Sequence, residues 1–193
     1  MLQSGWIWHP AENPTVSRKR AEARLRELVD RHLDFVARVL RNLGTPDGDV
    51  DDAVQKTFLV LSDRLERVRP GAEKAFLFQT AANVAAHVRR TLARRREVAE
   101  DRAPERSEEV PSPEALADRS RVRALLDQVL ESLDEDARAV FVLYEIEEMT
   151  MAEIATALEL APGTVASRLR RARGQFKDAI RRLQARTAEM EAS

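Results

Sequence analysis

Residues Thr150 to Lys177 read TMAEIATALELAPGTVASRLRRARGQFK, and this stretch predicts two short helices joined by a tight turn. Thr150 and Glu153 have the spacing of a capping box, which marks the start of the first helix. Pro162 and Gly163 break that helix and open the second one. In the second helix the apolar residues recur every three or four positions: Val165, Leu169, Ala172 and Phe176. The pattern is typical of a helix-turn-helix that reads a DNA major groove, and a helical hairpin with a solvated basic face is the alternative.

The composition of the whole chain favours an all-helical protein. It has 193 residues, of which 44% are hydrophobic and 34% charged, with few glycines and prolines and no run of β-branched residues. Cysteine is absent, which excludes disulfides and thiolate metal sites and fits a reducing cytoplasm. No apolar run approaches the roughly 20 residues of a membrane span, and the first residues lack the pattern of a signal peptide. We therefore expect a cytoplasmic protein with no membrane insertion.

The apolar periodicity divides the chain into two helical modules and an acidic linker. The expected segments are a disordered tail at 1–17 that holds Trp6 and Trp8, a first module at 18–96, a flexible linker at 97–120, a second module at 121–186 and a tail at 187–193. The first module is expected to hold helices at 18–42, 50–68 and 73–96. The inner face of the first of these helices includes Leu28, Leu33, Val36 and Leu40. In the second module, Asp134 is expected to cap one of the helices before the helix-turn-helix.

The positive charge of this near-neutral chain lies in two patches, one in each module. Five arginines crowd the end of the third helix, and residues 162–182 hold seven basic residues against one acidic residue. A solvated helix end is the simpler explanation for the first patch. Arginine clusters also neutralise nucleic-acid backbones, and two patches separated by an acidic linker are hard to explain by solubility alone.

Three stretches carry a resemblance to a known family. They are DVDDAVQKTFLVL (Asp49–Leu61), FLFQTAANVAAHVRR (Phe76–Arg90) and LDEDARAVFVLYEIEEMTMAEIATALELAPGTVASRLRRAR (Leu133–Arg173). In this order they resemble a bacterial extracytoplasmic-function (ECF) sigma factor, a promoter-specificity subunit of RNA polymerase. The resemblance covers most of residues 20 to 185. It implies a promoter-melting and core-binding domain of three to four helices (region 2, the first module) and a four-helix helix-turn-helix domain (region 4, the second module).

The resemblance also implies roles for particular residues of the first module. The helix that bears Asp52, Gln55 and Leu59 would dock on the clamp helices of the largest polymerase subunit. The third helix and the turn before it would bind and help melt the −10 element. The residues implied there are Arg69, Lys74, Phe76, Asn83, Arg89 and Arg90. Phe76 stands where the family usually has tryptophan, a mild change that keeps an aromatic ring.

In the second module the resemblance implies that the helix-turn-helix reads the −35 element. The implied contacts are Thr164, Ser167, Arg168, Arg170 and Arg171. Arg170 and Arg171 are the strongest candidates for base readout, because arginine can bind guanine O6 and N7 in a bidentate way. Two positions depart from the family: Ala166 replaces a commonly basic residue, and Glu159 holds a turn position often taken by glycine.

The implied partners are promoter DNA and the polymerase core, including its clamp helices and flap, with an anti-sigma factor as a further partner of many such proteins. No cofactor is implied. A stand-alone helix-turn-helix regulator remains an alternative, although it gives no purpose to the Asp52–Gln55–Leu59 surface. An enzyme is disfavoured, because His9, His32 and His87 have no metal-ligand spacing and the adjacent Asp51 and Asp52 would diverge on a helix.

Overall fold

The computed structural model describes residues 14–99 and 115–191, and every regular element in these ranges is helical. The N-terminal half contains α1 (Pro14–Asn42), α2 (Asp47–Arg64), the 3-10 helix η1 (Leu65–Arg67) and α3 (Glu73–Ala99). The C-terminal half contains α4 (Ala115–Glu131), α5 (Glu135–Phe141), the π-helix η2 (Val142–Ile146), α6 (Met151–Ala157) and α7 (Pro162–Glu191). The prediction of an all-α fold with two helical domains is confirmed.

In the N-terminal half, α1, α2 and α3 pack against one another around a core of large aliphatic side chains. Leu40, Leu61 and Leu77 are completely buried there, as the helical periodicity predicts. The prediction for Leu33 was wrong, because 45% of this residue is exposed. It lies beside a groove between α1 and α2 that no other element of the described chain fills.

The end of α1 is a Schellman motif, the C-terminal turn in which one residue takes a left-handed conformation. Gly44 has φ of 87°, the backbone N–H of Thr45 donates to the carbonyl of Leu40, and that of Gly44 donates to the carbonyl of Arg41. Glycine is favoured at this position because a Cβ atom is strained at positive φ. This turn sends the chain back along α1 as α2.

In the C-terminal half, α5 packs across α7, and the short helix α6 with the long helix α7 forms the predicted helix-turn-helix. The capping box of Thr150 and Glu153 is confirmed, and so is the cap of Asp134, whose carboxylate accepts from the backbone N–H of Ala137. The predicted apolar stripe of α7 faces inward: Val165, Leu169 and Ala172 are buried, and Phe176 stacks on Phe141 with ring centroids 4.8 Å apart.

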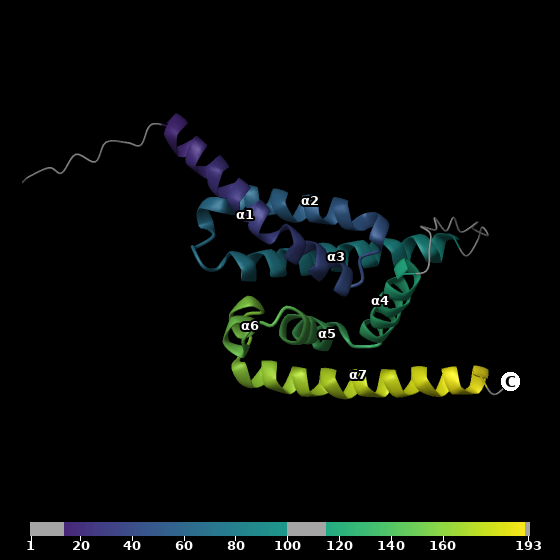
Figure 1. Ribbon diagram of the computed structural model, residues 1–193. Helices are drawn as coiled ribbons and strands as arrows, with labels where there is room; N and C mark the ends of the chain where they lie inside the picture. Colours follow the sequence, from purple (N-terminus) through teal and green to yellow (C-terminus); the bar gives the residue numbers. More distant parts are fainter. Residues whose placement is uncertain (1–13, 100–114, 192–193) are drawn as a thin grey trace, which may run out of the picture.

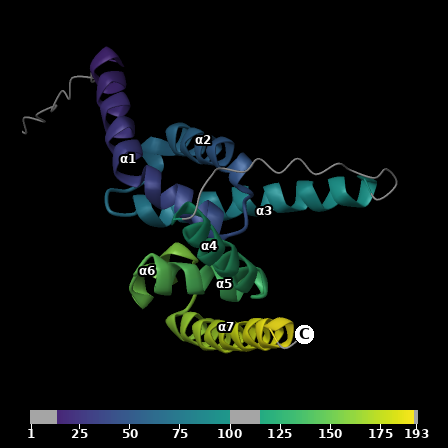
Figure 2. The ribbon, with the colours of Figure 1, turned by 45° about the vertical axis from the view of Figure 1, so that its right-hand side comes forward.

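The two halves are in contact, which the sequence did not indicate. Figure 1 shows α3 between the other N-terminal helices and the C-terminal half, with α7 along the outer edge, and Figure 2 shows the same order from another side. One hydrophobic cluster runs through both halves. Because α3 contacts α1, α2 and α6, it buries more than one stripe, including Phe78 and Ala85.

Helix ends differ from the expected positions in both halves. Helix α1 begins at Pro14, α3 continues to Ala99, α4 begins at Ala115 and α7 runs to Glu191, so helices reach into the segments expected as tails and linker. The rest of the N-terminal tail, with Trp6 and Trp8, and the centre of the linker lie outside the described residues. The π-helix after α5 was also not predicted.

Candidate nucleic-acid and polymerase interfaces

The turn between α6 and α7 takes the left-handed backbone conformation that usually requires glycine, although Glu159 holds that position. Glu159 has φ of 53°, and the backbone N–H of Leu160 donates to the carbonyl of Ala155, so this turn is a second Schellman motif. A non-glycine residue in this conformation costs about 1–2 kcal/mol relative to glycine. The turn nevertheless forms, and it places Pro162 at the first position of α7.

The arginines of α7 differ in what they contact. Arg168 lies 2.7 Å from a carboxylate oxygen of Asp136, and Arg171 lies 3.0 Å from one of Asp134. Arg173, one turn further on, pairs with Glu145 at 2.7 Å. Three basic side chains of α7 are therefore held by acidic residues of α5 and η2, within the same half of the molecule.

Asp134 holds Arg171 while it also caps α5. Partial burial by itself would raise the pKa of this carboxyl, but the hydrogen bonds from Ala137, Gln175 and Arg171 outweigh it and lower the pKa. The carboxylate is thus charged at neutral pH and keeps Arg171 against α5.

Arg170 and Ser167 of α7 are both exposed. Ser167 donates its hydroxyl to the backbone carbonyl of Thr164, one turn earlier, where Thr164 is half-buried. Within residues 14–99 and 115–191, Arg170 forms no ion pair. Of the two arginines that the sequence ranked equally for base readout, Arg171 is thus held by a carboxylate and Arg170 forms no ion pair within the described residues.

The candidate −10 residues, five on α3 and one in the turn before it, divide into two groups. Phe76, Asn83 and Arg90 are spaced by seven residues, so they form one stripe along the helix, with Asn83 and Arg90 exposed and Phe76 half-buried. Arg69, in the turn before α3, is exposed as well. Lys74 and Arg89 are not part of the stripe. Both are half-buried and make contacts with residues outside α3.

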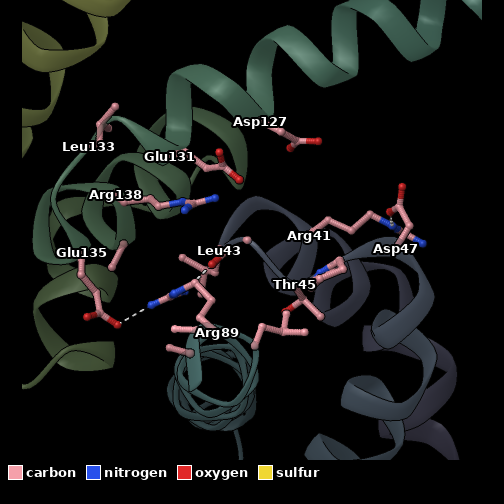
Figure 3. A pocket seen from close by; sticks show the side chains of 16 residues that line it. Arg41, Leu43, Thr45, Asp47, Arg89, Asp127, Glu131, Leu133, Glu135 and Arg138 are labelled. Atoms are coloured by element: carbon pink, nitrogen blue, oxygen red, sulfur yellow. Dashed lines mark hydrogen bonds and ion pairs between the residues drawn. The ribbon is translucent and has the colours of Figure 1, made fainter. Parts of the chain in front are cut away.

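Lys74 and Arg89 both contact residues of the C-terminal half. The Nζ atom of Lys74 lies 3.4 Å from the backbone carbonyl of Glu147 and 5.0 Å from the ring centroid of Phe35. Arg89 donates to the backbone carbonyl of Leu43 and lies 2.5 Å from the carboxylate of Glu135, as the dashed lines in Figure 3 show. The structure thus does not gather all six candidate residues into one surface.

The candidate docking surface for polymerase lies at the apolar groove between α1 and α2. Leu59 is 57% exposed and lines this groove of about 450 Å³ together with Gln55, while Asp52 is exposed on the same helix outside the lining. The residues that line the groove are Leu25, Val29, Leu33, Asp51, Val54, Gln55, Phe58, Leu59 and Ser62. Leu33, on the opposite wall, is the residue that sequence reasoning assigned to the core. Two exposed leucines on facing helices mark a surface suited to an apolar partner.

Other kinds of site find no support in the described ranges. Residues 14–99 and 115–191 contain no group of three histidine, aspartate or glutamate side chains that could hold a metal ion. No helix in those ranges is long and apolar enough to cross a membrane.

Family models match both halves of the chain. Residues 28–95 match sigma-70 region 2, and residues 123–176 match sigma-70 region 4. The chain is 31% identical over 197 residues to the ECF RNA polymerase sigma factor SigE of Mycolicibacterium smegmatis, which covers 96% of this chain and 75% of that protein. It is 30% identical over 165 residues to the ECF RNA polymerase sigma-E factor of Escherichia coli, which covers 81% of this chain and 86% of that protein.

Solved structures show the same fold. The structure of CnrH in complex with the cytosolic domain of CnrY has a TM-score of 0.63 and 28% identity, and the match covers 82% of this chain and 88% of that one. The sigma factor RpoE of Bartonella quintana, in complex with the anti-sigma factor NepR, has the same TM-score at 20% identity, with 81% of this chain and 96% of that one covered.

A helix-turn-helix and a region 2 helix bundle in one chain define an RNA polymerase specificity subunit. The chain belongs to the ECF RNA polymerase sigma factors, which direct promoter-specific transcription. The alternative of a stand-alone helix-turn-helix regulator is not favoured, because such a protein has no region 2.

Proposed function

We propose that this sigma factor recognises promoters through two separate surfaces, one on α7 and one on α3. On α7, Arg170 and Ser167 read the −35 duplex, with Thr164, Arg168 and Arg171 at the edges of the contact. Arg170 supports this assignment, because it is exposed and has no ion pair among residues 14–99 and 115–191, whereas Arg168 and Arg171 are held by carboxylates.

On α3, the stripe of Phe76, Asn83 and Arg90 binds the −10 element as it opens. An aromatic ring, an amide and a guanidinium in line can stack on an unpaired base, hydrogen-bond to it and neutralise the adjoining phosphate. Arg69, Lys74 and Arg89 supply further phosphate contacts beside this stripe. The single observation that carries the proposal is this stripe on α3, in the same chain as a helix-turn-helix.

The groove between α1 and α2 is proposed to bind the polymerase core. Leu59 and Gln55 at its edge, with Asp52 beside them, would contact the clamp helices of the largest subunit, and region 4 would contact the flap. The bond-making chemistry stays with the polymerase, so the chain itself has no catalytic role, needs no cofactor and acts in the cytoplasm where transcription takes place.

A protein anti-sigma factor is proposed as a further partner. Two structures similar to this chain are complexes with such a protein or with a cytosolic domain of a second protein, namely RpoE with NepR and CnrH with CnrY. The exposed apolar groove of α1 and α2 would suit a competing partner as well as the polymerase.

Selection of genomic fragments by the reconstituted holoenzyme tests this proposal. The selected fragments are expected to share two sequence elements separated by a constant spacing. On such a fragment, Asn83→Ala should reduce the permanganate reactivity of unpaired −10 thymines, while protection of the −35 element persists. If Asn83→Ala removed both the permanganate reactivity and the −35 protection, or neither of them, separate roles for α3 and α7 would be contradicted.

A further inference from the structure

Acidic groups of the C-terminal half contact cations of the N-terminal half at the interface between the two. Arg38 donates from Nε and Nη2 to the two carboxylate oxygens of Glu147, at 3.2 and 2.9 Å. The Glu147 side chain is only 2% exposed, and the backbone carbonyl of the same residue accepts from Lys74. Glu147 thus connects α1 and the start of α3 to the loop between η2 and α6.

A second set of contacts lies further along α3. Arg89 is bound by the carboxylate of Glu135, at the start of α5, and by the backbone carbonyl of Leu43. Close to it, Arg138 of α5 donates from Nε to the backbone carbonyl of Asn42 at 2.7 Å. Figure 3 shows Arg89 and Arg138 reaching from opposite halves toward the loop between α1 and α2.

We propose that the C-terminal half acts as an internal competitor of −10 DNA in the chain that is free of polymerase. The carboxylate of Glu135 takes the place of a DNA phosphate at Arg89, and Glu147 does the same at Lys74 through its backbone carbonyl. This inference rests on the proposed function, because it treats Lys74 and Arg89 as −10 contacts. It adds that these two cations become available only when the halves separate.

Promoter geometry requires such a separation. Elements at −35 and −10 lie about 25 base pairs apart, which is about 85 Å along B-form DNA. Helix α7, with 30 residues, is only about 45 Å long, and the half that contains it packs directly on α3. A closed molecule therefore cannot place α7 and α3 on their two elements at the same time.

The closed state carries an electrostatic cost that makes opening feasible. Arg138 is 6% exposed, and its Nη2 atom has no hydrogen-bond partner among the described residues. Burial, together with the nearby positive charge of Arg89, lowers the pKa of this guanidinium to about 10. A buried, incompletely paired charge weakens an interface. The polar contacts at Glu135 and Glu147 then add to the apolar contacts between the halves in setting the population of the closed state.

The test uses the full-length chain without polymerase. Because the chain has no cysteine, Arg26→Cys on α1 and Gln184→Cys on α7 allow two dyes to report the distance between the halves. Glu135→Gln with Glu147→Gln removes the two charges from the interface. Arg38→Gln breaks the Glu147 pair from the other half and serves if the buried Glu147 change impairs folding. Glu159→Gln with Asp178→Asn is the matched control, since both residues are exposed in the same half and neither lines the cavity that Arg38, Lys74 and Glu147 share.

Energy transfer should fall in Glu135→Gln/Glu147→Gln and in Arg38→Gln but not in the control. A mixed-sequence single-stranded DNA of 12 nucleotides should bind the double variant about tenfold more tightly at low salt. The dependence of log K on log salt should steepen by about 1.4, because each of two freed cations contributes about 0.7 on single strands. Unchanged energy transfer would contradict the proposed internal competition. So would separation of the halves without a higher DNA affinity and a steeper dependence of log K on log salt.

Core-dependent transcription by the same variants separates this inference from the proposed function. Normal transcription together with unchanged energy transfer overturns only the internal competition. Absence of transcription by the wild-type chain with core polymerase overturns the proposed function, whatever the position of the two halves.

Discussion

The Nη2 atom of Arg171 lies 3.0 Å from a carboxylate oxygen of Asp134, the residue that also caps α5. This contact joins two parts of the helix-turn-helix domain that are 37 residues apart in the sequence. It gives Arg171 a structural role, whereas Arg170, its neighbour on α7, forms no ion pair within the described residues.

Arg170→Ala is expected to remove base discrimination at the −35 element. A bidentate arginine–guanine contact contributes about 1–3 kcal/mol of discrimination, so the ratio of specific to random duplex affinity should fall by about 5- to 150-fold. Arg171→Ala should lower both affinities by a similar and smaller factor, because Arg171 already pairs with Asp134. Fluorescence anisotropy on matched duplexes measures both. A larger loss of discrimination in Arg171→Ala would reverse the assignment.

Leu59→Asp is expected to abolish binding to the polymerase core while the fold persists. The side chain is 57% exposed, so a charge there should change the free energy of unfolding by less than about 0.5 kcal/mol. A residue at the centre of an interface contributes about 2 kcal/mol or more to binding. Val122→Asp is the control, because Val122 is 68% exposed on α4, away from the groove. Co-sedimentation measures the affinity of each variant for the polymerase core. Equal affinity for the two variants would show that the docking surface is not at this groove.

Glu153 makes the stability of the helix-turn-helix depend on acid pH. Hydrogen bonds from the backbone N–H and the hydroxyl of Thr150 lower the pKa of Glu153 from its ordinary 4.5. A lowered pKa in the folded state stabilises the protein fully above the unfolded value, and this stabilisation is lost as the pH falls through the folded value.

The wild type should therefore be more stable than Glu153→Gln near neutral pH, and the difference should shrink steadily below about pH 4.5. Urea unfolding at several pH values measures it. The exposed Glu148→Gln should show no such trend. A difference between wild type and Glu153→Gln that is constant from neutral pH to about pH 3 would exclude the charge as its origin.

Gly44→Ala is expected to lower the thermal stability of the chain. Gly44 has φ of 87°, and an added Cβ atom would lie 3.1 Å from Nη1 of Arg138. The left-handed conformation alone costs about 1–2 kcal/mol for alanine, and each 1 kcal/mol corresponds to about 2–4 °C in Tm at this size. Gly174→Ala in α7 is the control, because nothing surrounds its Cβ position and alanine favours a helix. If Gly44→Ala melts at or above the wild-type temperature, the strain assigned to this turn is absent.

The elements that could be predicted from the sequence depend on neighbours close in the chain. The Thr150 cap, the Asp134 cap and the α7 stripe that begins at Val165 involve residues no more than about five positions apart at each step, and all three are present. The residues that form each of these features also stabilise it, so the sequence pattern alone was enough to predict it.

The features that could not be predicted depend on residues far apart in the chain. Lys74 contacts Glu147 across 73 positions, and Phe78 is buried because α3 packs against helices of both halves. Leu33 was assigned to the core because its spacing is correct, but no helix in the described part of the chain covers the groove beside it. Periodicity shows which face of a helix is apolar, and it does not show which neighbour covers that face.

Run-off transcription by core polymerase, with and without the chain, tests the sigma-factor function most directly. On a genomic fragment selected by the holoenzyme, we expect a discrete transcript only when the wild-type chain is present, and its loss with Leu59→Asp. The same background transcription with and without a folded wild-type chain would contradict a role in promoter-specific initiation.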